Sequence, residues 1–486
     1  MANSHVEVHQ LAHRITPNPK RVITRFFGSD EEKTKRRIAR VLTLSESEAQ
    51  KLLNKLESVY RESHPDIEDV WMENYERATA GLAMAAPPTR AHQLLGGAYF
   101  TMEYAIESAA LFNPSIVGLV DQEGVAPGCT RFVMSLRAIG EGHLSSVVFR
   151  MGEIDEANNI IIEPQSSIAR QMKVIPDAEF ETAFFRNALD DLQSLGPLEC
   201  QVLDNLGESF SLPELKSELH RAGKLAPSKT YWKATVQNML TLAASNYRLS
   251  IPQGIPVSEI VIFPTSQKER HGIEDLRLVR FHNDDGSACI YGTYTAFNGI
   301  SGIPSFLVTH DLQTVESHTM AGPYAVNKGM ALFPRKINGN YVMSGRSDGE
   351  NLYIMESDNP LVWNRARPAQ EPKYWWEFSV IGNCGSPIET PEGWLLLTHG
   401  VGPMREYCIG AALLDLDDPA KVIGRTKDPL IMPNEHDRTG YVPNVVYTCG
   451  SMLHNGSLIL PYAMSDWITT FARIDMVELL HMLKST

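Results

Sequence analysis

Acidic and basic side chains stand close together in one short segment, residues 271–277, which reads His-Gly-Ile-Glu-Asp-Leu-Arg. In an extended strand the side chains alternate between two faces, so Asp275 and Arg277 should lie on one face and Glu274 on the other. A carboxyl group in this setting can donate a proton as a general acid, or it can form an ordinary ion pair with the arginine. The segment by itself leaves both interpretations open.

A repeated turn in the second half of the chain places this segment in a larger pattern. The turns contain Gly286, Gly339, Gly393 and Gly456, which are 53, 54 and 63 positions apart, and each precedes an apolar strand. A period of about 50 residues is typical of the four-stranded blades of a β-propeller. Together with the strand-like residues at about 131–163, the repeats predict a mainly β fold, a five-bladed β-propeller. The alternative is a β-sandwich in which the spacing arises by coincidence.

The repeat also brings further polar side chains to the position of Asp275. Asp275 and Lys328 each stand 11 residues before the turn glycine of their repeat, and Asn444 stands 12 residues before its own. Arg346 and His399 follow their turn glycines by seven and six residues. Because equivalent positions of a propeller lie on the same rim, we expect these groups to converge near its axis.

Such a group of side chains suits the cleavage of a glycosidic bond by inorganic phosphate. A carboxyl group can protonate the leaving oxygen, while lysine, arginine and histidine hold a phosphate dianion against the opposite face of the sugar. Phosphate would then replace the second carboxylate of an inverting glycosidase. Taken singly, Lys328 could be an ordinary surface lysine and Arg346 an ion-pair partner of Asp348. His399 could be a half-buried histidine with satisfied hydrogen bonds.

Aromatic residues in the connections between strands are candidates for holding a sugar ring. Tyr294 and Trp467 are two of them, and Trp376 is a third. Packing in the core is the competing interpretation, and it suits Trp376 better than Trp467.

The composition excludes several classes of function. The chain has 486 residues and a formal net charge of −14, without a long basic run, so we expect no nucleic-acid partner. Residues 1–17 are polar and no later stretch of about 18 residues is apolar, which predicts a cytoplasmic protein without a membrane span. The six cysteines occur singly, and no zinc, P-loop or dinucleotide motif is present. We therefore expect no metal and no bound cofactor.

Two parts of the sequence have helical rather than β patterns. Residues 1–112 form a predicted helical N-terminal region, in which Ser45 begins an acidic, leucine-spaced helix. Residues 113–486 form the predicted propeller, interrupted by a helical insertion at about 177–247. The helical parts could pack on the propeller, shape the acceptor side of the pocket, or support a homo-oligomer.

Several segments resemble glycoside hydrolase family 130, the β-mannoside phosphorylases and mannosidases. They occur in the family's order within about residues 113–486: Gly272-Ile-Glu-Asp-Leu-Arg, Asn327-Lys-Gly-Met-Ala-Leu-Phe-Pro and the strand that ends in Ser344-Gly-Arg, Leu397-Thr-His-Gly, and Gly440-Tyr-Val-Pro-Asn-Val-Val-Tyr. The resemblance implies a five-bladed propeller and an inverting enzyme with one catalytic acid. It depends on all of the segments together.

The resemblance also implies roles for individual residues. It makes Asp275 the general acid, which can reach the leaving oxygen through a hydroxyl of the bound mannose, with inorganic phosphate as cosubstrate and mannose 1-phosphate as product. Lys328, Arg346 and His399 would bind the phosphate. The expected substrate-binding residues are Asn113, Arg137, Glu274, Arg277, Tyr294, Asn444 and Asp466.

Two other functions remain open at this point. A β-mannosidase would cleave the same bond with water and would need a second carboxylate as base, for which Glu377, Glu389 and Asp348 are candidates. A sugar-binding propeller would have no activity. The chain departs from the family in Leu276, where proline is usual, and in its two helical parts, which resemble a longer branch. The linkage and the acceptor sugar therefore do not transfer.

Overall fold

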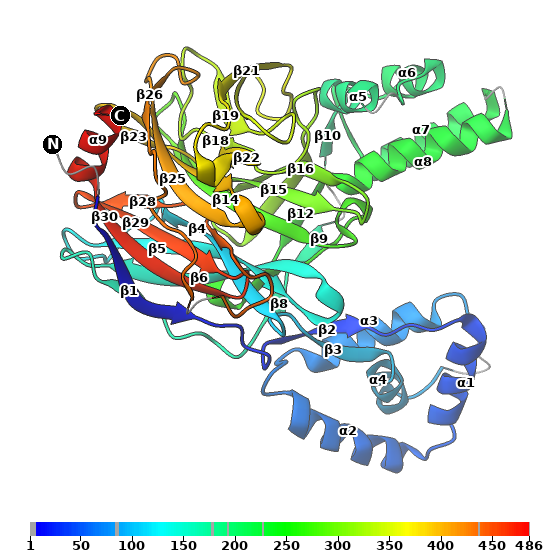
Figure 1. The fold of residues 1–486 in the computed structure, drawn as a ribbon. Helices are drawn as coiled ribbons and strands as arrows, with labels where there is room; N and C mark the ends of the chain where they lie inside the picture. Colours follow the sequence, from blue (N-terminus) through cyan, green and yellow to red (C-terminus); the bar gives the residue numbers. More distant parts are fainter. Residues whose placement is uncertain are drawn as a thin grey trace.

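The computed structural model describes residues 6–82, 87–175, 179–191, 194–225, 228–435 and 438–485, which form a mainly β protein with added helices (Figure 1). Most strands in these ranges belong to five largely antiparallel sheets of four or more strands. None of the described helices is both long and apolar enough to cross a membrane. The mainly β class with helical additions is thus confirmed.

The first three sheets are composed mostly of strands that follow one another in the sequence. The first sheet contains β4 (Ala110–Gly118), β5 (Thr130–Ile139), β6 (Ser145–Ile154), β7 (Ile160–Ile162), β13 (Ile260–Ile262) and β8 (Arg170–Gln171). The second sheet contains β14 (Ile273–His282), β15 (Ala288–Phe297), β16 (Gly302–Thr309), β17 (Thr314–Thr319), β12 (Tyr247–Ser250) and β9 (Lys173–Ile175). The third sheet contains β18 (Ala331–Leu332), β19 (Tyr341–Gly345), β20 (Leu352–Ser357) and β21 (Arg365–Gln370).

The last two sheets complete the β body. The fourth sheet contains β22 (Val380–Asn383), β23 (Ile388–Thr390), β24 (Gly393–Val401), β25 (Tyr407–Leu414) and β26 (Val422–Arg425). The fifth sheet contains β27 (Val446–Tyr447), β28 (Met452–His454), β29 (Ser457–Met464), β30 (Ile468–Asp475) and β1 (Val8–Ile15).

Each repeated turn predicted from the sequence connects two successive strands of one of the later sheets: β14 and β15, β18 and β19, β23 and β24, and β28 and β29. Gly286, Gly339, Gly393 and Gly456 all have positive φ, between 74° and 145°. Glycine adopts this backbone conformation without the steric cost that a side chain adds. The four turns therefore recur because each one begins the same hairpin in a new sheet.

The five sheets contact one another in a closed series. β14 contacts β4 of the first sheet, β15 contacts β18 of the third, and β19 and β20 contact β22 of the fourth. β25 then contacts β27 of the fifth sheet, and β29 contacts β4, which returns to the first. Figure 1 shows the sheets following one another around the β body.

The N-terminal strand β1 is a difference from the predicted helical region at 1–112. It pairs with β30 and so joins the first strand of the chain to the last sheet. Two further strands in this range, β2 (Val22–Phe26) and β3 (Thr101–Ala105), pair in an antiparallel orientation. The sequence of β1 gave no signal, because only Ile15 of its side chains is buried and the strand lacks alternation. The division after residue 112 stays a prediction, although β4 crosses it.

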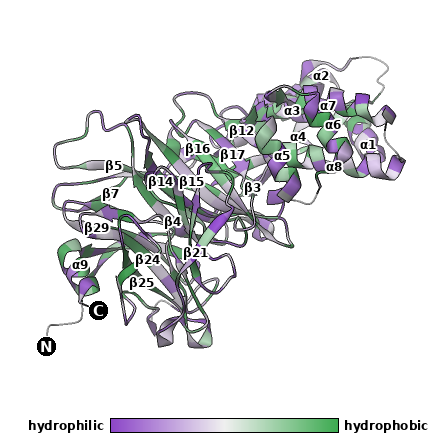
Figure 2. Cartoon of the chain, turned by 90° about the horizontal axis from the view of Figure 1, so that it is seen from above, coloured by the Kyte–Doolittle hydropathy of each residue, from purple (hydrophilic) through white to green (hydrophobic). Residues whose placement is uncertain are grey.

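Apart from the C-terminal helix, the described α-helices form two groups on the same side of the β body, as Figures 1 and 2 show. The N-terminal group contains α1 (Glu31–Val41), α2 (Glu46–Tyr60), α3 (Ile67–Thr79) and α4 (Arg90–Ala98). Helix α2 begins with the expected capping box between Ser45 and Glu48. A C-terminal helix, α9 (Met476–Lys484), follows β30 and was not predicted.

The predicted insertion forms the second group. It contains β10 (Glu179–Glu181), α5 (Thr182–Asp191), α6 (Pro197–Asp204), β11 (Ser209–Ser211), α7 (Leu212–Ala222) and α8 (Lys229–Ser245). The insertion starts after β9 and ends at β12, at the edge of the second sheet opposite to β14. Its apolar side chains form a cluster of their own that also contains Ala321 of the β body. The helices are therefore anchored on the far edge of the sheet that carries Asp275.

A buried ion cluster joins the N-terminal part to the first sheet. Glu107 is fully buried, and it accepts hydrogen bonds from Arg21 at 3.1 Å and from Arg150 of β6 at 3.1 and 3.2 Å. Arg21 also donates to the carbonyl of Ser258 at 2.8 Å. One carboxylate thus compensates two guanidinium groups that have no access to water.

We expect Glu107→Gln to destabilise the protein by about 3–5 kcal/mol, because it leaves two buried arginines without a counter-charge. Urea unfolding of the variant should show a lower midpoint than the wild type. Glu156→Gln, on the surface, is the matched control and should change the midpoint little. Equal midpoints for Glu107→Gln and the control would contradict this account of the cluster.

Candidate active site

Two strands carry equivalent distortions where they approach each other. The pairing register of β4 shifts after Phe112 and that of β14 shifts after Glu274. The residues inside the two bulges, Asn113 and Asp275, have positive φ of 50° and 56°. Asparagine and aspartate tolerate this conformation better than most side chains. The side chains then meet, and Asn113 donates a hydrogen bond from Nδ2 to Oδ1 of Asp275 at 2.7 Å.

Arg137 of β5 connects the two neighbouring acids. Its Nη2 lies 2.8 Å from Oε1 of Glu274, and its Nη1 lies 3.3 Å from Oδ1 of Asp275. The guanidinium group also lies over the ring of Phe112, 5.3 Å from its centroid. Simple strand alternation predicted Glu274 and Asp275 on opposite faces, and this was wrong. The bulge in β14 rotates the second acid toward the same arginine.

The charge state of Asp275 follows from its neighbours. Burial alone would raise the pKa of this carboxyl group, but the guanidinium groups of Arg137 and Arg277 outweigh burial and hold it below the ordinary value. The hydrogen bond from Asn113 and the charge of Lys328 act in the same direction. With these protein groups alone around it, Asp275 is therefore an ionised carboxylate.

Arg277 is fully buried and fixes the backbone at this point. Its Nη1 donates to the carbonyl oxygen of Asp275 at 2.9 Å, and its Nε donates to the carbonyl of Cys384 at 2.7 Å. Nη2 donates to the hydroxyl of Tyr447 at 2.9 Å. These three bonds join the second, fourth and fifth sheets around the acid. Arg277 thus positions Asp275, whereas its role toward a substrate stays a prediction.

Lys328 lies at the edge of the same cluster. Its Nζ forms an ion pair with Glu274 and lies 5.4 Å from the centroid of the Phe297 ring. The side chain is 45% exposed, so the ammonium group can reach a ligand from solvent. By repeat offset Lys328 matches Asp275, whereas Asn327, one position earlier, shares the positive φ of Asp275, with a value of 61°.

Arg346 follows β19 and packs against His399. A Cβ atom added to Gly382 would lie 2.5 Å from Cδ of Arg346 and 2.7 Å from Cε1 of His399, so glycine allows this close contact. Nε of Arg346 is buried and has no hydrogen-bond partner among the described residues. It lies 3.8 Å from the position of a Cβ at Gly329, beside Lys328. The sequence also allowed Arg346 to be an ion-pair partner of Asp348 instead of a phosphate-binding residue. Among the described residues, Arg346 and Asp348 form no ion pair.

His399 is buried between aromatic rings. Its ring is stacked on Tyr407 and lies edge-on to Tyr447, with centroids 6.1 and 4.9 Å apart. Nδ1 lies 3.1 Å from the carbonyl oxygen of Asn383, and since a carbonyl only accepts, Nδ1 carries the proton. Burial, together with the charge of Arg346, lowers the pKa of His399 well below its usual value. The histidine is therefore neutral, with a lone pair on Nε2.

The sequence analysis missed two asparagines that hold the site together. Asn383 donates from Nδ2 to the carbonyl of Gly329 at 2.7 Å, which fixes the turn beside Lys328. Asn327 donates to the carbonyl of Ser347 at 2.8 Å and so holds the segment that carries Arg346. A sequence signal for Asn327 was present, since it stands 12 residues before Gly339, as Asn444 does before Gly456. In the structure, positive φ is shared by Asn113, Asp275, Asn327 and Asn444.

Asp466 and Asn444 come from the fifth sheet. Asp466 lies in the turn between β29 and β30, with φ of 48°. Burial and the charge of Asp275 raise the pKa of Asp466 to about 6, against the opposing effect of Arg137 and Arg405. Asp466 therefore interacts electrostatically with Asp275 and Arg137 of the cluster. Asn444 accepts a hydrogen bond from the N–H of Tyr407 on its backbone oxygen at 2.9 Å.

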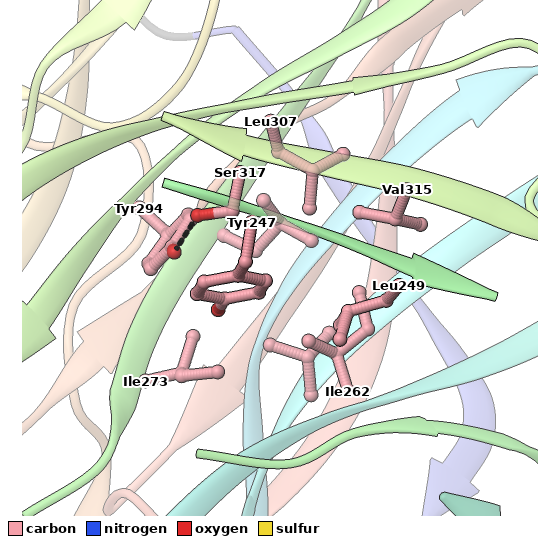
Figure 3. Close-up of a pocket in the computed structure, with 10 residues that line it drawn as sticks. Tyr247, Leu249, Ile262, Ile273, Tyr294, Leu307, Val315 and Ser317 are labelled. Atoms are coloured by element: carbon pink, nitrogen blue, oxygen red, sulfur yellow. Dashed lines mark hydrogen bonds between the residues drawn. The ribbon is translucent and has the colours of Figure 1, made fainter. Parts of the chain in front are cut away.

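Tyr294 lies outside this cluster, which corrects its assignment as a substrate-binding residue. Figure 3 shows it among apolar side chains of the first and second sheets, around a cavity of only about 10 Å³. Its hydroxyl bonds to Oε1 of Glu269 at 2.7 Å and to Ser317 at 2.6 Å. The ring is buried because strand alternation points it into the core. Trp376 is likewise buried, whereas Trp467 is 38% exposed.

The three carboxylates proposed as a hydrolytic base are all engaged elsewhere. Glu377 is fully buried in an ion pair with Arg425. Glu389 forms two bonds with Arg335, at 2.6 and 2.9 Å. Asp348 accepts bonds from the backbone N–H groups two and three residues later, at 2.9 and 2.8 Å. Across the described ranges, no three His, Cys, Asp or Glu side chains form a group that could hold a metal ion.

A comparison with protein families identifies the class of this site as carbohydrate-active. Residues 233–485, more than half of the chain, match the family model described as β-1,4-mannooligosaccharide phosphorylase. The chain therefore belongs to glycoside hydrolase family 130. The matched range contains Asp275, Lys328, Arg346 and His399.

Similar proteins of known name are bacterial phosphorylases. The chain is 37% identical over 155 residues to a 1,2-β-oligomannan phosphorylase of Thermoanaerobacter sp. (strain X514), covering 32% of this chain and 52% of that protein. It is 31% identical over 234 residues to a β-1,2-mannobiose phosphorylase of Listeria innocua, covering 46% and 63%. The match thus spans about half to two thirds of these relatives. The solved structure of a Listeria innocua β-1,2-mannobiose phosphorylase gives a TM-score of 0.45 at 20% identity, over 79% of this chain and 94% of that one.

The raised pKa of Asp466 predicts a pH-dependent stability. Because the folded value of about 6 lies above the ordinary 3.8, the stabilising contribution of Asp466 is full at low pH and is lost as the pH rises through about 6. Asp466→Asn does not titrate. Between about pH 5 and pH 7, the free energy of unfolding of Asp466→Asn should rise relative to that of the wild type by on the order of 1 kcal/mol.

Urea unfolding at the two pH values measures this difference, with Asp358→Asn on the surface as the matched control. If the stability of the wild type and that of Asp466→Asn change equally with pH, the result would contradict a raised pKa of Asp466 caused by burial and by Asp275.

Proposed function

We propose that this chain is an inverting β-mannoside phosphorylase, in which inorganic phosphate displaces a sugar and Asp275 protonates the leaving oxygen. The products are mannose 1-phosphate and the shortened sugar. The observation that carries the proposal is the buried Nε of Arg346, which has no hydrogen-bond partner among the described residues and lies in the same cluster as Asp275 and Lys328. The names of the relatives, all phosphorylases of β-mannosides, support it.

The bond changes assign a role to each side chain. A phosphate oxygen attacks the anomeric carbon while the glycosidic bond breaks, and the leaving oxygen receives the proton of Asp275. Lys328 and Arg346 hold the negative charge of phosphate, and His399 accepts a hydrogen bond from the P–OH of HPO₄²⁻ through Nε2. A neutral histidine suits the monoprotonated anion because it offers a lone pair rather than a second charge.

Phosphate also helps to explain how a carboxylate becomes an acid. The charge of Lys328 contributes to the low pKa of Asp275. An anion that pairs with Lys328 offsets this charge, so the pKa of Asp275 rises and the carboxyl group takes up a proton more easily. The acid would then be formed chiefly when the nucleophile is in place.

We further propose that the five sheets are the blades of a propeller. The closed series of contacts between sheets supports this arrangement, and so does the pairing of β1 with β30, which joins the two ends of the chain in one blade. The bulges of β4 and β14 would then lie near the axis, where residues from all blades can meet.

Product analysis tests the function directly. The protein is incubated with β-1,2- and β-1,4-linked mannobiose, with and without phosphate, and the products are separated by anion-exchange chromatography. We expect mannose 1-phosphate only when phosphate is present. Release of free mannose at the same rate without phosphate would show a hydrolase, and the absence of turnover with both linkages would oppose an enzyme of this class.

Asp275→Asn should lower kcat by at least about 10³-fold, because an amide cannot supply the proton. Binding of mannobiose should persist, since the change removes little volume. Initial rates and calorimetric binding measure the two properties separately. If Asp275→Asn keeps a tenth or more of the wild-type kcat, Asp275 is not the general acid.

Lys328→Ala should raise the KM for phosphate by about tenfold or more and change the KM for the sugar much less. Lys336 supplies the control, because it follows β18, whereas Lys328 precedes it, and it pairs with Asp284 at 3.0 Å. Lys336→Ala should leave both KM values near those of the wild type. A defect of Lys328→Ala confined to the sugar KM would place this lysine outside the phosphate site.

A further inference from the structure

The N-terminal helical group contains a cavity that the proposed reaction does not use. It lies between α2, α3 and α4 and the paired strands β2 and β3, outside residues 233–485 that match the family. Its volume is about 390 Å³. Pockets for small organic ligands typically have volumes of about 300–1,000 Å³. The cavity is thus large enough for a ligand.

Helix α2 has apolar side chains that line this cavity and that the rest of the protein covers only in part. Only Ala49 and Leu53 of the helix are buried. Leu52 and Leu56 line the cavity, and Leu52 is 39% exposed. Trp71 of α3 lines the other side and is buried. An apolar ligand between these walls would remove this surface from water, which is the main source of affinity in such pockets.

Two polar side chains of the lining, His64 and Glu103, are paired with each other. His64 is buried, and its Nε2 lies 2.9 Å from Oε1 of Glu103. The two side chains compensate each other and are held in place by this contact. They form a fixed hydrogen-bonding pair beside the apolar walls, as is typical of ligand pockets.

Lys55 supplies the charge that selects the ligand. It lines the cavity and forms no ion pair within the described ranges of the chain. Its neighbours three and four positions away on α2 are Lys51, Leu52, Ser58 and Val59, so the helix offers no acid to pair with it. An ammonium group next to apolar walls, with no acid on its own helix, is complementary to an anionic head group.

We propose that this cavity binds a small amphipathic anion, with an acyl or aryl body between α2 and Trp71 and a carboxylate or sulfonate head at Lys55. The proposal is independent of the function assigned to Asp275, because no residue of the cavity belongs to that site. It gives the N-terminal region a ligand-binding role that the family match does not cover.

The test uses 1-anilinonaphthalene-8-sulfonate, an aryl sulfonate whose fluorescence increases in apolar surroundings. We expect saturable binding of one probe per chain to the native full-length protein, and competition by decanoate. N-phenyl-1-naphthylamine, which lacks the sulfonate, should bind more weakly. Binding of the two probes with equal affinity would overturn the role of Lys55, and the absence of saturable binding would overturn the site.

Two pairs of variants on α2 locate the probe. Lys55→Ala should weaken binding by about two- to fivefold, whereas Lys51→Ala, one turn away and outside the cavity, should not. Leu52→Asn should weaken binding by roughly tenfold, whereas Val59→Asn, two turns further along α2, 60% exposed and outside the cavity lining, should not. Thermal unfolding of each variant confirms that it is folded. Equal affinity of each variant and its control would place the probe elsewhere and contradict the proposal.

Discussion

The site depends on the guanidinium group of Arg137, which contacts the carboxylates of two neighbouring residues at once. Glu274 and Asp275 can share this partner only because β14 is bulged and Asp275 adopts a positive φ. Without the arginine, two adjacent carboxylates would repel each other in a poorly solvated place. The bulge, the arginine and the acid therefore form a single unit, and Asn113 in the equivalent bulge of β4 completes it.

The rest of the cluster balances charge around this unit. Arg277 is committed to the protein through three hydrogen bonds, and Lys328 pairs with Glu274 while it remains half exposed. Arg346 differs, because its buried Nε has no partner among the described residues and, unlike Arg137, it forms no ion pair there. A buried donor without a partner costs free energy. We interpret the unpaired Nε of Arg346 as a donor available to an anion. The oxygen atoms of this anion would accept a hydrogen bond from Arg346 and would compete with Glu274 for Lys328.

The sequence predicted the features that depend on local turn chemistry and on repetition. The turn glycines and the mainly β class were found, because each hairpin needs a positive φ at the same place. The repeat also brought Asp275, Lys328 and Arg346 to attention. Strand β1 was missed because its side chains lack alternation, and the face of Asp275 was wrong because a bulge leaves no clear trace in one sequence. The neutrality of His399 and the burial of Tyr294 depend on neighbours distant in the chain.

Titration calorimetry of phosphate, with and without mannose, tests the central claim that this cluster is an anion site built around Arg346. We predict binding of one phosphate per chain to the wild type, retained in Asp275→Asn and weakened at least about tenfold in Arg346→Met. Absence of phosphate binding to the wild type under both conditions, or equal affinity in Arg346→Met, would contradict the account.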